Sequence, residues 1–213
     1  MLCTNYRYIC SNGHLGRVRL VLYYLYSYTT GLYRPAPLRM WEATIKYCKF
    51  ADDAYEIACA FTYATMAGMT NEHQDLTSNG HVPHLIAYLT NLHKSWGIRQ
   101  GTFAKEVAAS LQLLQQQLGT DGDPDQYASA MREMCAIRRF FVTRDGRLGI
   151  GPSGLRSGDV VTILFGSGVP MILRKRAGRW LLVGDCYIHG LIEGQAIDRV
   201  ETGAATAQWF NIH

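Results

Sequence analysis

The chain has 213 residues, of which 48% are hydrophobic and 18% charged, and its formal net charge is +4 with histidine neutral. This apolar share is enough to bury a core and excludes an intrinsically disordered chain. Residues 1–137 hold eleven basic and eleven acidic side chains, whereas residues 138–213 hold ten basic and six acidic, a difference of four that equals the whole excess. Such an asymmetry could attract an anionic partner, although an ordinary solvated surface explains it more simply.

The cysteines and the N-terminal segment indicate a soluble protein of a reducing compartment. The six cysteines are scattered and no two form a C-x-x-C, so we expect neither disulfides nor a metal knuckle. The Tyr-rich stretch Val18–Tyr26 is too short for a membrane span and lacks the features of a signal peptide. We expect it to form an edge strand or to be poorly ordered, and we expect the protein to be cytoplasmic.

Helical patterns follow the break at residues 31–37, so we treat residues 1–37 as an N-terminal extension. Helix signals then run through residues 38–138. Asp53 with Glu56 resembles a capping box, and Asp123 before Pro124 predicts another helix start. Residues 38–50 are one candidate helix. Apolar side chains at steps of three and four predict amphipathic helices in the segments 54–67, 82–96 and 103–118. The last helix should run from Pro124 to about Arg138.

After residue 138 the period changes to that of short strands. We expect strands near 140–143, 148–150, 160–165, 170–173, 180–183 and 208–212, separated by glycine-rich turns. We read Arg174–Gly178 as a charged turn, and 187–197 as a short helix or corner. Several short strands at close spacing predict a small β-barrel or sandwich over residues 139–213.

No motif in the sequence predicts a familiar catalytic site. The loops Gly151–Gly154 and Gly166–Gly168 do not fit a phosphate loop, and His81, His84 and His93 lack further ligands for zinc. Cys186 and His189 are close in sequence to Glu193, but in a strand the thiol and imidazole would point to opposite faces.

Five short motifs follow one another in the last third in one order, namely Arg139–Thr143, Gly146–Pro152, Gly158–Val161, Val169–Arg174 and Leu182–Gly194. As an ordered set they resemble the C-terminal barrel region of fungal heterokaryon-incompatibility (HET) proteins, with a fainter similarity at Phe61–Met66. The chain departs from that pattern in having Asp185 where Glu is usual and Cys186 where a small residue is usual. No N-terminal HET domain is recognisable, so the resemblance implies the part that follows it. It also implies a role in self/non-self recognition and cell death.

These observations predict an α+β protein, with an N-terminal helical region followed by a small C-terminal β-barrel. We expect a non-enzymatic regulatory or interaction module with no cofactor, metal or membrane, and with a protein partner such as a HET effector domain. Candidate binding residues are Asp159, Arg174, Tyr187, His189 and Glu193. Asp159 also suits an Asx-type turn.

Two alternatives stay open at this point. One is a small hydrolase that uses Cys186, His189 and Glu193. The other is binding of an anion or nucleic acid through a basic turn formed by Arg174, Lys175, Arg176 and Arg179, whose simpler interpretation is a charged hairpin tip. We regard nucleic acid as the less favoured partner, because the basic residues do not form a dense stripe.

Overall fold

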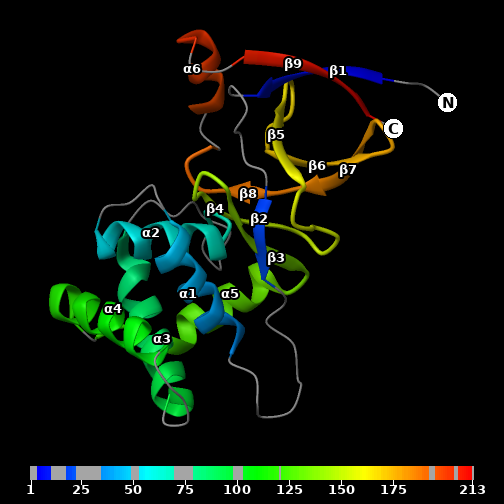
Figure 1. Cartoon of the computed structure of the whole chain (residues 1–213). Helices are drawn as coiled ribbons and strands as arrows, with labels where there is room; N and C mark the ends of the chain where they lie inside the picture. Colours follow the sequence, from blue (N-terminus) through cyan, green and yellow to red (C-terminus); the bar gives the residue numbers. More distant parts are fainter. Residues whose placement is uncertain are drawn as a thin grey trace.

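A helical half and a β-rich half lie side by side in the protein, joined through a small sheet (Figure 1). The structure is a computed structural model, and it describes residues 4–10, 18–22, 35–48, 53–69, 79–97, 103–119, 121–191, 195–203 and 206–212. The predicted α+β class, with helices followed by a β-barrel, is confirmed. No helix within these residues is long and apolar enough to cross a membrane.

Two helices of the helical half begin where an aspartate side chain satisfies their first free backbone N–H groups. The helical half contains α1 (Ala36–Tyr47), α2 (Ala54–Thr65), the short 3₁₀ turn η1 (Asn79–His81), α3 (Val82–Gly97), α4 (Phe103–Leu118) and α5 (Pro124–Cys135). The Asp53 carboxylate accepts a 2.7 Å hydrogen bond from the Glu56 N–H at the start of α2. Asp123 caps α5 in the same way, with Pro124 as the first helical residue. Both predicted starts are confirmed. The last helix ends at Cys135 rather than Arg138, which already belongs to a strand.

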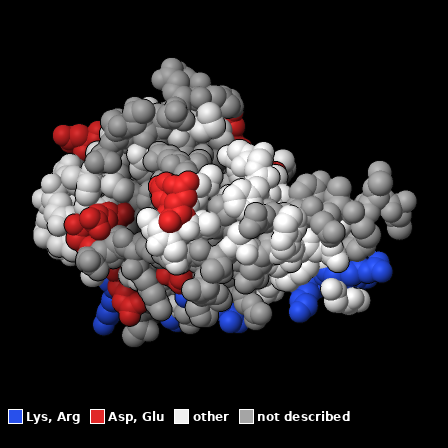
Figure 2. Space-filling model, turned by 90° about the horizontal axis from the view of Figure 1, so that it is seen from above, with Lys and Arg blue, Asp and Glu red and all other residues white. Residues whose placement is uncertain are grey.

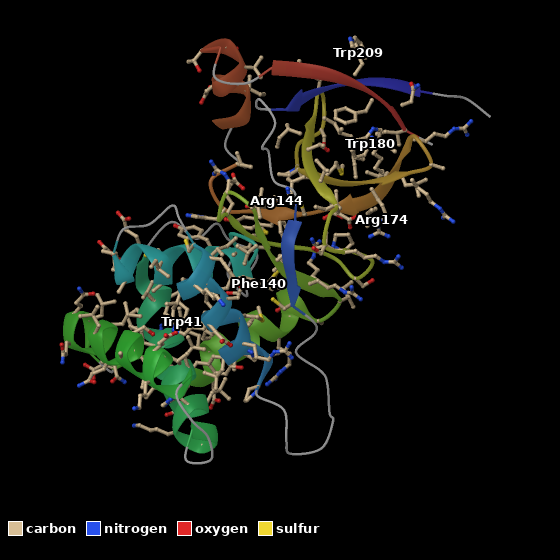
Figure 3. The ribbon with its side chains drawn as sticks, in the orientation of Figure 1. Trp41, Phe140, Arg144, Arg174, Trp180 and Trp209 are labelled. Atoms are coloured by element: carbon tan, nitrogen blue, oxygen red, sulfur yellow. The ribbon has the colours of Figure 1, made fainter. Side chains whose placement is uncertain are left out.

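A four-stranded antiparallel sheet lies between the helices and the barrel. Its order is β2 (Val18–Leu22), β3 (Arg138–Thr143), β4 (Leu148–Pro152) and β8 (Tyr187–Ile188). Side chains alternate along β3, and both of its faces are buried. Phe140 faces the helices, where its ring packs 5.7 Å from that of Phe61, which packs edge-on 5.3 Å from Trp41 (Figure 3). Phe141 faces the other way, into a second cluster with Ile172. The sheet therefore joins two cores.

The barrel consists of five strands that close on themselves. Their order is β1 (Thr4–Cys10), β5 (Val160–Leu164), β6 (Met171–Arg176), β7 (Arg179–Asp185) and β9 (Thr206–Ile212), and a short helix, α6 (Gln195–Glu201), precedes β9. All neighbouring strands are antiparallel except β7 and β9, which run parallel where Trp180 pairs with Ile212. Closure gives every barrel strand two neighbours, with β7 and β9 paired at one position.

Two segments of the region 1–37 belong to these sheets, although the sequence set that region apart as an extension. Thr4–Cys10 is β1 and pairs with both β5 and β9, so the barrel is incomplete without it. Val18–Leu22 is β2, an edge strand of the four-stranded sheet, as one of the two expectations for the Tyr-rich stretch had it. The rest of that stretch, residues 23–26, lies outside the described residues. Local periodicity did not assign β1 because its partners lie at the other end of the chain.

Candidate interaction surface

The best-defined polar contact of the barrel joins Asp159 to Arg174. Asp159 precedes β5 and is 2% exposed, and its side-chain oxygens accept hydrogen bonds of 2.7 Å from both Nε and Nη2 of Arg174. The backbone N–H of Arg156 donates a third bond of 2.7 Å to Oδ2, and Arg174 Nη2 also donates to the Gly154 carbonyl. The hydrogen bonds that Arg174 donates to Asp159 raise the pKa of Arg174. Since the pair is bidentate and buried on the Asp159 side, both charges are already compensated.

This contact gives Asp159 and Arg174 a structural role in holding the loop at residues 153–158 against strand β6. Asp159 braces the preceding loop as expected, but by accepting the N–H of Arg156, three residues earlier, and not through the bond two residues further on that defines an Asx turn. The position of both residues follows from the register, in which Val160 pairs with Leu173 and their outer neighbours are Asp159 and Arg174. Arg174 is thus a positioning residue for the hairpin that follows it.

The basic residues after Arg174 lie on two strands, and the prediction of a turn at Arg174–Gly178 is wrong. Strand β6 continues to Arg176, strand β7 starts at Arg179, and only Ala177 and Gly178 connect them. Both connecting residues have positive φ, 49° and 79°, as a tight hairpin turn requires. Alanine rarely adopts positive φ, so Ala177 does not indicate a two-residue turn, and the sequence therefore suggested a longer one. Arg176 and Arg179 are direct cross-strand partners, and Lys175 pairs with Trp180.

The side chains of this hairpin divide between the two faces of the barrel wall. The Trp180 ring packs edge-on against Phe210 of β9, with centroids 4.8 Å apart, so these two side chains share the inner side. Because side chains alternate along a strand, Arg179 and Trp209 lie on the outer side. Arg176 joins them as the partner of Arg179. We call Arg176, Arg179 and Trp209 the outer hairpin face.

The outer hairpin face is open to solvent. Arg176 and Arg179 are exposed, and neither makes an ion pair with any described residue. Trp209 is 66% exposed and projects away from the barrel (Figure 3). The acidic side chains in view in Figure 2 lie toward the side of the helices and α6, and Lys and Arg side chains appear along the lower edge and at the barrel end. The sequence analysis missed Trp209, although the alternation of Trp209 and Phe210 in the expected last strand could have indicated an exposed indole.

Tyr187 and His189 lie at the junction between the helices and the four-stranded sheet. The Tyr187 ring packs so closely on Gly68, after α2, that a Cβ there would lie 2.7 Å from Cε2 of the ring. The His189 ring packs on Tyr63 of α2 with a centroid separation of 5.2 Å, and the backbone N–H of His189 donates to the Leu148 carbonyl. These contacts dock α2 onto the sheet. The fifth candidate, Glu193, lies outside the described residues.

Cys186 is buried between the sheet and the barrel, in the second core. It is 3% exposed, and burial raises the pKa of its thiol further than the nearby Asp185 does. His189 stands three residues further along an extended segment, or about 10 Å away, and packs on the opposite side against α2. The thiol and the imidazole are therefore not brought together. Within the described residues there is also no group of three His, Cys, Asp or Glu side chains that could hold a metal ion.

The sequence of this chain is similar to those of known proteins. The family model of the Het-6 beta-barrel domain matches residues 84–204, which run from α3 through the barrel strands β5, β6 and β7 to the end of α6. A relative, heterokaryon incompatibility protein 6, OR allele, of Neurospora crassa, is 34% identical over 68 residues, which make up 30% of this chain and 10% of that protein. The similarity thus covers about a tenth of the relative's length. No solved structure matches the chain.

Proposed function

Because the chain belongs to the family of the Het-6 beta-barrel domain, we propose that it acts in heterokaryon incompatibility as a non-catalytic recognition module. In this role it binds a protein partner during self/non-self recognition and thereby influences the death of fused cells. The observation that carries the proposal is the match of the family model from α3 to α6, a span that includes most of the barrel and the sheet that docks it. The relative named for heterokaryon incompatibility supports the same process.

The contacts of the candidate residues support structural rather than catalytic roles for them. Asp159 and Arg174 compensate each other's charge, and Tyr187 and His189 pack against α2. A cysteine hydrolase needs an accessible thiolate beside a base. Cys186 does not meet this requirement, since its thiol is buried and the pKa of that thiol is raised. The hydrolase alternative is therefore not favoured.

The proposal can be tested by expressing the chain in Neurospora crassa strains that carry or lack the OR allele of the relative. Viability of fused cells is scored with a vital dye, and the protein level is measured in the same cultures. We expect the chain to change the fraction of dead fused cells in one pairing of strains. A Cys186→Ala variant should act like the parent chain, since no reaction depends on its thiol. An unchanged fraction of dead cells in every pairing, with the chain present at full level, would refute the proposal.

A further inference from the structure

We propose that the outer hairpin face docks an acidic segment of a partner protein, with Arg176 and Arg179 binding its carboxylates and Trp209 covering an adjacent apolar side chain. This inference rests on the proposed function, because it names the surface and the partner chemistry of that recognition module.

Arg176 and Arg179 lie close enough together to bind carboxylates of one segment. As direct cross-strand partners they have Cβ atoms about 5 Å apart, so both guanidinium groups can reach neighbouring carboxylates of one segment. Guanidinium groups bind carboxylates through two parallel hydrogen bonds, which adds direction to the attraction. Like charges placed directly opposite each other repel, and no described carboxylate relieves this pair. An acidic ligand would relieve this repulsion.

The face is also held in place before any ligand arrives. The hairpin turn has only two residues, and Arg174 at its base is fixed by Asp159. Trp180 packs on Phe210 and anchors β7 to β9 on the inner side. A side chain mounted on rigid strands loses less conformational entropy when it binds.

The outer hairpin face also includes an exposed indole on a neighbouring strand of the barrel. Trp209 stands three residues before Ile212, which pairs with Trp180, so it lies about 10 Å along β9 from the start of β7. Trp and Arg are the residue types most enriched among binding hot spots.

Two observations favour a protein segment over nucleic acid. The hairpin carries only three exposed cations, Lys175, Arg176 and Arg179, and Lys175 shares the side of Trp180 rather than the outer side. Nucleic-acid binding usually requires a longer basic stripe that follows several phosphates.

The test measures binding of fluorescently labelled probes to the full chain by anisotropy. The probes are a short peptide in which glutamates alternate with leucines, the same peptide with glutamines, and a single-stranded DNA of similar length. We expect the glutamate peptide to bind most tightly. The variant R176E/R179E should weaken its binding by about tenfold or more, and Trp209→Ala should weaken it several-fold. The matched control K105E/R144E makes the same charge change at exposed residues of α4 and the β3–β4 turn, and should alter the affinity by less than about twofold.

The inference is overturned if the glutamine peptide or the DNA binds as tightly as the glutamate peptide. It is equally overturned if the control variant loses as much affinity as R176E/R179E, or if no probe binds. These outcomes are separable from failure of the proposed function. Hairpin-dependent peptide binding without any effect on fused cells would uphold the docking face and refute the role in incompatibility. An effect on fused cells that R176E/R179E leaves intact would refute the docking face alone.

Discussion

Replacing Arg174 by methionine should destabilise the barrel far more than breaking a surface ion pair. Methionine retains most of the apolar stem but removes every hydrogen bond that Asp159 accepts from Arg174. The Asp159 side chain is 3% exposed, so its charge would be left buried with only the Arg156 N–H as a donor. Removing one partner of a buried pair costs about 3 to 5 kcal/mol. We expect a loss of about 3 kcal/mol in the free energy of unfolding, because the Arg174 side chain is 25% exposed.

The matched control is Asp185→Asn, which breaks the ion pair with Arg138. That pair has bonds of 3.1 Å, and its side chains are 33% and 55% exposed, so solvent screens it. We expect a cost below about 0.5 kcal/mol. The reverse change of the buried pair, Asp159→Ala, should cost less than Arg174→Met, because the remaining guanidinium can reach water. The double variant should then cost less than the sum of the single ones by about 2 kcal/mol.

Urea unfolding followed by circular dichroism measures these costs, provided the slope of free energy against urea stays constant across the variants. Repeating the series in 1 M NaCl should leave the effect of Arg174→Met nearly unchanged, since a buried pair is poorly screened. The reasoning fails if Arg174→Met is no more destabilising than Asp185→Asn, or if high salt removes the difference between them.

Three further outcomes are expected. Gly68→Ala should destabilise the protein by about 2 kcal/mol or more, because φ is +74° and the new methyl group would meet the Tyr187 ring. Gly119→Ala, at φ +81° in open space, should cost only about 1 kcal/mol. Thermal melts of the two variants compare these costs. Cys186 should resist iodoacetamide in the folded protein and react in urea, as mass spectrometry would reveal; rapid labelling of the native thiol would contradict its burial. Burial raises the pKa of Cys135 from 9.0 to about 12, so the unfolded chain binds fewer protons between these values, and stability should fall as pH rises through this window. Urea titrations over that range should give a smaller fall for Cys135→Ala.

The helical half could be predicted from sequence because its signals are local. Asp53 and Asp123 satisfy N–H groups within a turn of themselves, and the apolar stripe of α3 shows its period directly. The strands after residue 138 could be found for similar reasons, since β-prone runs alternate with glycine turns.

Contacts between distant segments could not be predicted in the same way. Nothing near Thr4–Cys10 reveals that it pairs with β9, and the short turn at Ala177 depends on an alanine with positive φ. The candidate residues show the same limit. Asp159 and Arg174 were both singled out, but their mutual hydrogen bonds follow from the β5–β6 register, which turns two candidate ligand-binding residues into one structural pair.

The closure of the barrel by β1 has a consequence for how the protein is made. Thr4 pairs with Ile212, so almost the whole chain lies between these partners. A ribosome delivers β1 long before β9, and β1 must therefore wait for this neighbour until all the residues between them have been translated. Pairings of such long sequence separation form slowly, because the entropy of closing the intervening loop is lost before the contacts form. The helical half, whose contacts are more local, can fold during this wait, and the barrel should be the last part of the protein to assemble.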